Sequence, residues 1–198
     1  MDRVAFRRKV ARTPDQMTPS EWAVLALLAE GPTHGFAVAR AMADDGDIGR
    51  VWSLRRPRVY YAIEVLTRLG FARAAETMPS RSGPARTVLR ITPSGRRAVT
   101  GWLATPVEHV RDARSLLLLK LLFLNRRQID PGPLLVAQRA HFDSIVERLQ
   151  GSVDGAHGFD ATLLRWRIET AGAAVRFIDA VIDGSSNPTA AAGAAGND

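Results

Sequence analysis

Residues 55–70 read RRPRVYYAIEVLTRLG and predict a helix that begins near Pro57 and ends at Gly70. One face carries apolar residues at the spacing of a single helical stripe: Val59, Ala62, Ile63, Leu66 and Leu69. The opposite face carries Tyr61, Glu64 and Arg68, with Tyr60 on the flank. Arginines crowd the N-terminal end at positions 55, 56 and 58. Such a helix can bury its apolar stripe on neighbouring helices and present a basic, aromatic end to the groove of a duplex.

Two shorter helices are predicted ahead of it. Thr18, Pro19 and Glu21 suit the N-cap, the first and the third position of a helix, in the pattern of a capping box. An apolar face follows, and Gly31-Pro32 ends this helix. A second helix is predicted from about His34 to Met42. We expect His34 to have a structural role, fixing the helix junction by hydrogen bonding to the backbone.

Two strand-like segments follow the tyrosine-bearing helix, at residues 71–77 and 86–91. Residues 79–84, with Arg81 among them, join the two segments and are rich in Pro, Ser and Gly. In the second segment Thr87, Leu89 and Ile91 alternate with Arg86, Val88 and Arg90. This alternation predicts one buried face and one basic face. The two segments therefore predict a β-hairpin with an arginine at its tip, and Thr92-Pro93 begins a further helix.

Three helices are predicted in the second half, at about residues 111–125, 133–150 and 162–183. The last has apolar residues at alternating steps of four and three, the spacing of a coiled-coil seam: Leu164, Ile168, Ala171, Val175, Ile178 and Ile182. This stripe suits either the core of its own chain or a partner helix. The helix at residues 133–150 also places apolar residues on one side: Leu135, Phe142, Ile145 and Leu149. Two such stripes in a small region favour a homodimer. Residues 184–198 are rich in Ala, Gly, Ser and Asn and are predicted to be disordered.

The net charge of +7 is unevenly distributed along the chain. Residues 1–104 hold 17 arginines and lysines against 9 acidic residues, whereas residues 105–198 hold 10 against 11. Nearly all the basic residues are arginines, whose planar guanidinium suits phosphate oxygens and guanine edges. A generally arginine-rich composition does not explain the asymmetry, so we expect the first half to bind nucleic acid. Residues 1–17 are predicted to be a basic, flexible arm, either a DNA-binding extension or simply a terminus.

The composition argues against catalytic and metal chemistry. There is no cysteine, so disulfides, thiolate metal sites and thiol nucleophiles are excluded. The four histidines lack metal-binding spacing, and the loop at residues 44–47 lacks the glutamate of a calcium loop because Arg56 stands at that position. We find no phosphate-binding glycine loop and no catalytic constellation, and so expect no enzyme, no cofactor and no metal. The charged N-terminus and the lack of a long apolar run predict a cytoplasmic protein that is not membrane-bound.

Three segments, in order and with matched spacing, resemble the PadR family of transcription regulators. Residues 31–36 (GPTHGF) are similar to the family's junction between its first two helices. Residues 60–66 (YYAIEVL), with Gly70, are similar to its recognition helix, and residues 83–96 to its wing and the start of its fourth helix. The helical second half resembles the longer PadR subfamily. Phe36 and Leu89 stand where the family commonly has tyrosine, so hydroxyl contacts from these positions are lost.

The resemblance implies a mainly α fold with a small β-hairpin, in which a winged helix-turn-helix domain precedes an all-α dimerisation domain. The chain then divides into an arm (1–17), a winged helix-turn-helix DNA-binding domain (18–104), a helical dimerisation domain (105–183) and a disordered tail (184–198). The resemblance also implies a repressor that binds a palindromic operator in double-stranded DNA as a homodimer and is released by a small-molecule effector.

In that fold the helix from Pro57 enters the major groove. The predicted DNA-binding residues are Arg55, Arg56, Arg58, Tyr60, Tyr61, Arg81 and Arg86. The arginines of the helix would contact phosphates or guanine edges, and the tyrosines phosphates, sugars or thymine methyls. The wing arginines would reach the adjacent minor groove or its backbone. The alternatives are solvated surface charge for each arginine and helix packing for Tyr60.

Two other functions remain open from the sequence. A winged helix used for protein–protein contact would carry a neutral or apolar third helix and wing, whereas these are basic. A non-specific architectural DNA-binding protein would protect no short palindrome in a footprint.

Overall fold

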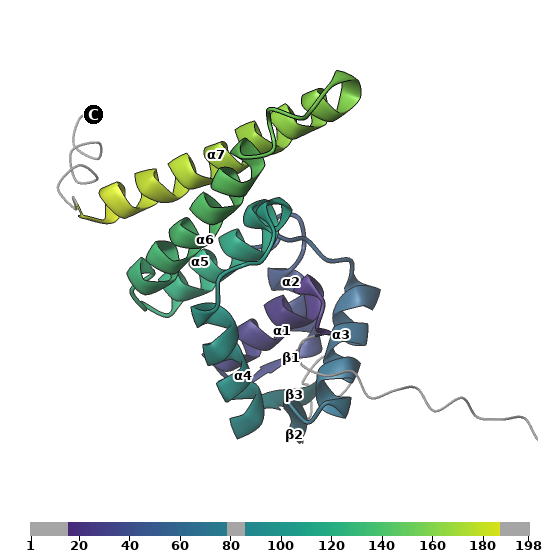
Figure 1. Cartoon of the computed structure of the whole chain (residues 1–198). Helices are drawn as coiled ribbons and strands as arrows, with labels where there is room; N and C mark the ends of the chain where they lie inside the picture. Colours follow the sequence, from purple (N-terminus) through teal and green to yellow (C-terminus); the bar gives the residue numbers. More distant parts are fainter. Residues whose placement is uncertain (1–15, 79–85, 187–198) are drawn as a thin grey trace, which may run out of the picture. The chain divides into compact units, whose positions relative to one another are not determined.

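The computed structural model describes residues 16–78 and 86–186 (Figure 1). The chain divides into two compact units, residues 1–102 and 103–198. A small three-stranded antiparallel sheet lies in the first unit, and helices make up most of the rest of the described residues. The predicted mainly α fold, a winged-helix domain followed by an all-α region, is therefore confirmed. The predicted arm up to residue 15, the hairpin tip at residues 79–85 and the tail from residue 187 lie outside the described residues.

The first helix, α1 (Pro19–Glu30), begins at the predicted capping box. The Glu21 backbone N–H donates to the Thr18 hydroxyl at 3.3 Å, and the Thr18 N–H donates to the Glu21 carboxylate at 2.7 Å. These two bonds satisfy N–H groups that a helix start otherwise leaves unpaired. Residues of α1 then form the centre of the first unit's core: Ala23, Val24, Leu25, Ala26 and Leu28.

Helices α2 (Gly35–Ala41) and α3 (Arg56–Arg68) pack on one another, and α3 also packs on α1. His34 is the N-cap of α2, where its Nδ1 accepts the Ala37 N–H at 3.0 Å, so its predicted structural role is confirmed. Four residues of the predicted apolar stripe are buried, Val59, Ala62, Ile63 and Leu66, whereas the fifth, Leu69, is partly exposed at the C-cap of α3. Gly70 follows α3 with φ +72°, a conformation that glycine adopts without strain.

The sheet has the strand order β1-β3-β2. Its strands are β1 (Thr33–His34), β2 (Ala72–Met78) and β3 (Arg86–Ile91). The β2–β3 hairpin confirms the prediction. β1 was not predicted, because a two-residue strand has no periodicity and forms only by pairing with residues 88 and 89, far along the chain.

The alternation predicted for β3 is only partly correct. Leu89 is buried and Arg90 is exposed, as expected. Thr87, predicted on the buried face, is exposed, and that part of the prediction was wrong. Thr87 lies towards the tip of the hairpin, beyond residues 88 and 89, where β1 pairs with β3.

Helix α4 (Pro93–Ala104) follows the sheet and joins the first unit's core. Its beginning is fixed by Thr92, whose hydroxyl accepts the Gly95 N–H at 3.1 Å and donates to the Gly70 carbonyl at 2.7 Å. Near its end Trp102 stacks on Trp22 of α1, with ring centres 5.3 Å apart and an angle of 5° between the planes.

The second unit is helical. A 3₁₀ turn (Val110–Asp112) and a π-helical turn (Ala113–Leu117) lead into α5 (Leu118–Arg126). α6 (Gly132–Gln150) and α7 (Gly158–Ser186) then form a helical hairpin (Figure 1). Helices α5, α6 and α7 each contribute fully buried apolar residues to the core of the second unit, among them Leu119, Phe123, Phe142, Ala171 and Ile178.

The stripe predicted at residues 164–182 lies largely against α6 of the same chain. Ala171 and Ile178, both in this stripe, are fully buried, and α7 packs chiefly on α6. Beside them, Arg139 Nε of α6 pairs with Asp179 Oδ1 of α7 at 2.5 Å. Two residues of the stripe thus belong to the core of their own chain, whereas Leu164, Ile168, Val175 and Ile182 are partly exposed, and a contact with a partner helix stays a prediction.

Residues 105–108, here called the pinned segment, follow α4 and are held by a buried glutamine. Gln138 of α6 is fully buried. Its Nε2 donates to the Val107 carbonyl at 3.0 Å, and its Oε1 accepts the Val107 N–H at 2.6 Å. One side chain thus satisfies both backbone groups of Val107, which a buried segment outside a helix or sheet otherwise leaves without partners.

Two further side chains hold the same segment. Lys120 of α5 is 3% exposed and donates to the Thr105 carbonyl, and burial lowers the pKa of its ammonium to about 8. His141 Nε2 of α6 lies 2.8 Å from the Glu108 carbonyl oxygen.

Across residues 16–78 and 86–186, no helix is both long enough and apolar enough to cross a bilayer.

Candidate nucleic-acid interface

The N-terminal end of α3 carries three exposed arginines. Arg55 is the N-cap, with extended backbone and no side-chain capping bond. Arg56 and Arg58 lie in the first turn, on either side of Pro57, whose fixed φ suits the start of a helix. The dipole of α3 adds positive partial charge at this end of the helix, beside these cations. This end of α3 therefore favours an anion such as a DNA phosphate.

Aromatic rings lie beside two of the three guanidinium groups. Arg56 Cζ is 5.7 Å from the ring centre of Phe36 in α2 and 5.7 Å from that of Tyr60. Arg58 Cζ is 6.0 Å from the ring centre of Tyr61. These are cation–π distances. A guanidinium whose flat face lies on a ring keeps its N–H edge available for a phosphate or a base.

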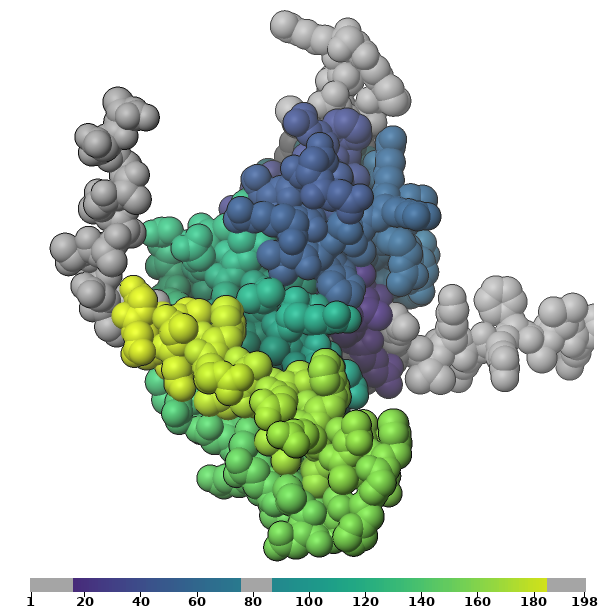
Figure 2. Space-filling model, turned by 90° about the horizontal axis from the view of Figure 1, so that it is seen from above, coloured from purple at the N-terminus to yellow at the C-terminus, as the bar shows by residue number. Residues whose placement is uncertain are grey.

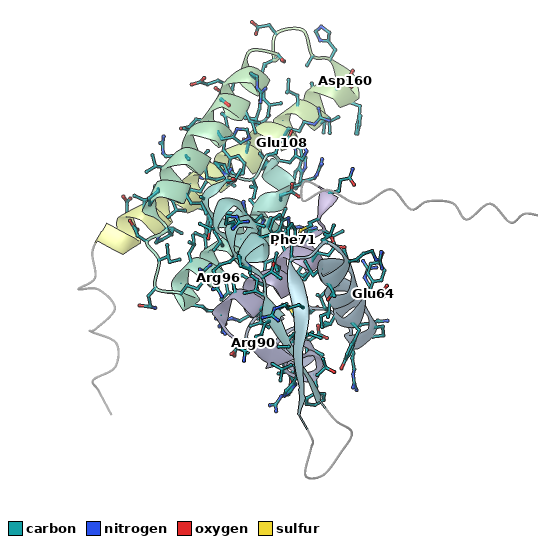
Figure 3. The ribbon with its side chains drawn as sticks, turned by 90° about the horizontal axis from the view of Figure 1, so that it is seen from below. Glu64, Phe71, Arg90, Arg96, Glu108 and Asp160 are labelled. Carbon is teal, nitrogen blue, oxygen red and sulfur yellow. The ribbon has the colours of Figure 1, made fainter. Side chains whose placement is uncertain are left out.

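The two tyrosines lie on the solvent face of α3. Tyr60 is 43% exposed and Tyr61 is 41% exposed, so each offers part of its ring and its hydroxyl to a partner. Glu64, on the outer side of the same helix (Figure 3), pairs with Arg68 one turn later. This pairing offsets the acidic charge locally, and the face remains basic towards its N-terminal end.

A surface hollow of about 570 Å³ lies beside this end of α3. Residues of α2 and of the segment leading into α3 line it, including Phe36, Arg40, Arg55 and Arg56, with Asp44 as the acidic member. Arg40 and Phe36 were not among the predicted DNA-binding residues. The sequence carries no sharp signal for them, because a single arginine or phenylalanine in a short helix is too common to be assigned a role.

The wing is described only in part. Arg81 lies between residues 79 and 85, outside the described residues. Arg86 is the first residue of β3, opposite Met78. Arg73 of β2 and Arg90 of β3 are cross-strand partners, and both are exposed (Figure 3 labels Arg90). The alternation in β3 already indicated a basic face containing Arg90, whereas Arg73 becomes part of it only through the strand register.

The donors of the candidate interface are guanidinium groups and phenol hydroxyls. The described part of the chain holds no group of three or more His, Cys, Asp or Glu side chains that could bind a metal ion. Donors of this kind recognise phosphate oxygens and the O6 and N7 acceptors of guanine. The arrangement can therefore bind a nucleic-acid backbone and read base edges.

Comparison with known proteins finds a family similar to the first part of the chain. The model of the transcriptional regulator PadR-like family matches residues 24–101. A Mycobacterium tuberculosis protein, described as probable transcriptional regulator Rv1176c, is 29% identical over 92 residues, which are 46% of this chain and 47% of the relative. The match thus spans about half the length of this curated relative.

Several solved structures are similar to the chain. The crystal structure of Bacillus subtilis PadR in complex with operator DNA is 21% identical, with 81% of this chain and 96% of that chain covered and a TM-score of 0.42. The structure of the same protein with p-coumaric acid is 22% identical, with 84% and 95% covered and a TM-score of 0.38. The PadR-like transcriptional regulator BC1756 from Bacillus cereus is 18% identical, with 87% and 98% covered and a TM-score of 0.40.

The family match runs from the middle of α1 to the last turn of α4 and so includes α2, α3 and the hairpin, the elements that form the candidate interface. Residues 24–101 therefore form a domain that is similar to the transcriptional regulator PadR-like family.

Proposed function

We propose that this protein is a transcription regulator that binds a palindromic operator in double-stranded DNA as a homodimer. The observation that carries the proposal is the N-terminal end of α3, where three exposed arginines adjoin two half-exposed tyrosines. The similarity of residues 24–101 to a family of transcription regulators supports the same assignment. In this proposal α3 lies in the major groove with its N-terminal end towards the base edges.

The proposed contacts divide by chemistry. Arg55, Arg56 and Arg58 bind phosphates or guanine edges, because a guanidinium fork matches both. Tyr60 and Tyr61 donate their hydroxyls to phosphates or pack on sugars. The wing contributes Arg81 and Arg86 to the adjacent minor groove or its backbone. Phosphate contacts supply affinity that falls with salt, and base contacts supply sequence preference.

The homodimer is supported by a second apolar stripe on α7, distinct from the one that packs on α6. Its members again follow steps of four and three: Phe159, Leu163, Trp166, Thr170, Ala173 and Phe177. Phe159 is 76% exposed, Trp166 68% and Phe177 40%. Figure 2 shows α7, in green to yellow, open to solvent along much of its length in that view. Three large aromatic side chains in one exposed stripe are rare on a monomer and suit an isologous helix contact.

Repression, and its relief by a small-molecule effector, complete the proposal. They follow from the resemblance to the family, and no side chain of this chain is assigned to the effector. Action on chromosomal DNA places the protein in the cytoplasm.

In vitro selection from a random duplex library tests DNA recognition. The full chain should enrich a short inverted repeat, and a footprint on that site should protect two half-sites about one helical turn apart. Enrichment of no sequence, together with salt-sensitive binding to every duplex, would instead indicate an architectural protein. No binding to duplex DNA at all would leave protein–protein contact as the use of the winged helix.

Replacing Trp166 by glutamate should convert the dimer into monomers. The carboxylate would have to be buried without a partner in the contact between two α7 helices. Size-exclusion chromatography with light scattering measures the mass directly. Arg165→Ala is the control, because Arg165 is a neighbouring exposed residue outside the stripe. A Trp166→Glu protein that remains dimeric would exclude this stripe as the interface.

A further inference from the structure

Phe36, in the first turn of α2, is 50% exposed. A single exposed apolar side chain is common and by itself indicates nothing. Phe36 differs because its ring has a charged neighbour from another helix, the guanidinium of Arg56. The same guanidinium lies at the same distance, 5.7 Å, from the ring centre of Tyr60. One cation of the candidate interface is therefore flanked by two aromatic rings.

The backbone around α2 fixes both rings. A Cβ atom on Gly35 would lie 2.8 Å from Tyr60 Cε1, so the Tyr60 ring rests directly on the start of α2 and any larger residue at position 35 would displace it. The bond from the Ala37 N–H to His34 fixes the same turn. The ring centres of His34 and Phe36 are 6.4 Å apart, which adds a further contact on the side of Phe36. The site for the guanidinium is thus built by the packing of α2 on α3.

Ordering a free arginine side chain on binding costs conformational entropy, because its long stem has many rotamers. A guanidinium already stacked on rings has lost part of that freedom before DNA arrives, so less is lost for each hydrogen bond formed. Phe36 has no donor or acceptor of its own. Apart from packing on a sugar, its contribution to DNA binding can only pass through Arg56.

We infer that Phe36 is a positioning residue of the DNA-binding surface, which with Tyr60 holds the Arg56 guanidinium ready to contact one site on the operator. The inference rests on the proposed DNA binding and adds to it a residue that makes no polar contact with the DNA. It also gives Phe36 a role that does not need the hydroxyl of a tyrosine at that position.

The test is a double-mutant cycle on the operator selected by the wild-type chain. Phe36→Leu should weaken operator binding about two- to fivefold, the scale of an exposed cation–π contact. Phe36→Tyr, which keeps the ring, should bind like the wild type. Affinity for scrambled duplex and the slope of log K against log salt should be the same for Phe36→Leu and wild type, because no charge is removed.

The cycle is closed by measuring Phe36→Leu in the Arg56→Ala background. There its effect should vanish, because the group that Phe36 positions is absent. An equal loss in both backgrounds would overturn the inference and indicate that Phe36 packs on the DNA directly. Arg56→Lys gives a second background for the same test, since lysine keeps the charge but not the flat guanidinium. In that background too, Phe36→Leu should have no further effect.

The two proposals fail in different ways. If the wild-type chain enriches no sequence and binds no duplex, the proposed function is wrong. If it binds its operator tightly and Phe36 shows no coupling to Arg56, only the positioning role is wrong. A melting temperature measured for each variant separates both results from a loss of folding. If Phe36→Leu lowers it, all variants of the cycle are compared at a temperature at which each of them is fully folded.

Discussion

Replacing Arg56 and Arg58 together by alanine is expected to weaken operator binding about 100- to 1,000-fold, since each well-placed arginine contact contributes about 1–3 kcal/mol. Both side chains are exposed at the N-terminal end of α3, and each lies beside an aromatic ring. Within the described residues neither takes part in an ion pair. Removing them therefore leaves no carboxylate unpaired, and the stability of the fold should hardly change. Fluorescence anisotropy with a labelled operator measures the affinity.

The salt dependence of the same variant distinguishes phosphate from base contacts. If both arginines bind phosphates, the slope of log K against log salt should fall in magnitude by about 1.8. If both bind base edges, the slope should stay close to that of the wild type and selectivity over scrambled duplex should fall instead. Arg111→Ala with Arg114→Ala is the matched control, because it removes two exposed charges from the second unit. Equal losses in the two double variants would reduce the role of α3 to general electrostatic attraction.

Local signals in the sequence predicted most of the first unit. The capping box at Thr18 and Glu21, the cap at His34 and the glycine after α3 each involve residues a few positions apart. Their geometry is set by the chain's own turns, so spacing alone is informative. The apolar stripe of α3 is likewise a property of one helix. From that stripe, the exposed positions of Tyr60 and Tyr61 follow.

Contacts between distant segments could not be predicted in the same way. The flanking of Arg56 by Phe36 depends on how α2 packs on α3, and on side-chain rotamers that no spacing rule gives. Arg73 joins Arg90 only through the register of the hairpin, which shifts between residues 74 and 76. The pairing of Gln138 with Val107 joins residues 31 positions apart in the sequence.

The exposed stripe of α7 was missed for a different reason. The predicted helix began at Thr162 and so left Phe159 outside it, whereas α7 begins at Gly158 with φ +56°. Without Phe159 the aliphatic stripe at residues 164–182 was the stronger pattern and was interpreted as the dimer seam. The corrected beginning of the helix brings Phe159, Trp166 and Phe177 onto one face and moves the proposed interface to it.

Gln138→Leu is expected to lower the free energy of unfolding by about 3 kcal/mol, because a buried polar group that loses its partner costs about 1–3 kcal/mol. The substitution leaves two backbone groups of Val107, its N–H and its carbonyl, without the partner that Gln138 provides. Water does not readily replace that partner, because Val107 is only 4% exposed. Leucine restores some apolar burial but can neither donate nor accept. Urea unfolding, followed by circular dichroism, measures the change in the free energy of unfolding. It is obtained from the shift in the midpoint urea concentration when the slope of free energy against urea is unchanged.

Gln150→Leu, at the exposed end of the same helix, is the control and should change stability by no more than about 0.5 kcal/mol. Amide hydrogen exchange adds a readout at the site itself. The Val107 N–H, which donates to Gln138 in the wild type, should exchange at least about tenfold faster in Gln138→Leu, in proportion to the loss of local stability. If Val107 stays protected and stability falls by less than about 1 kcal/mol, Lys120 and His141 would suffice to hold the pinned segment. If instead the Val107 N–H loses its protection from exchange, Gln138 is the residue that chiefly holds the pinned segment.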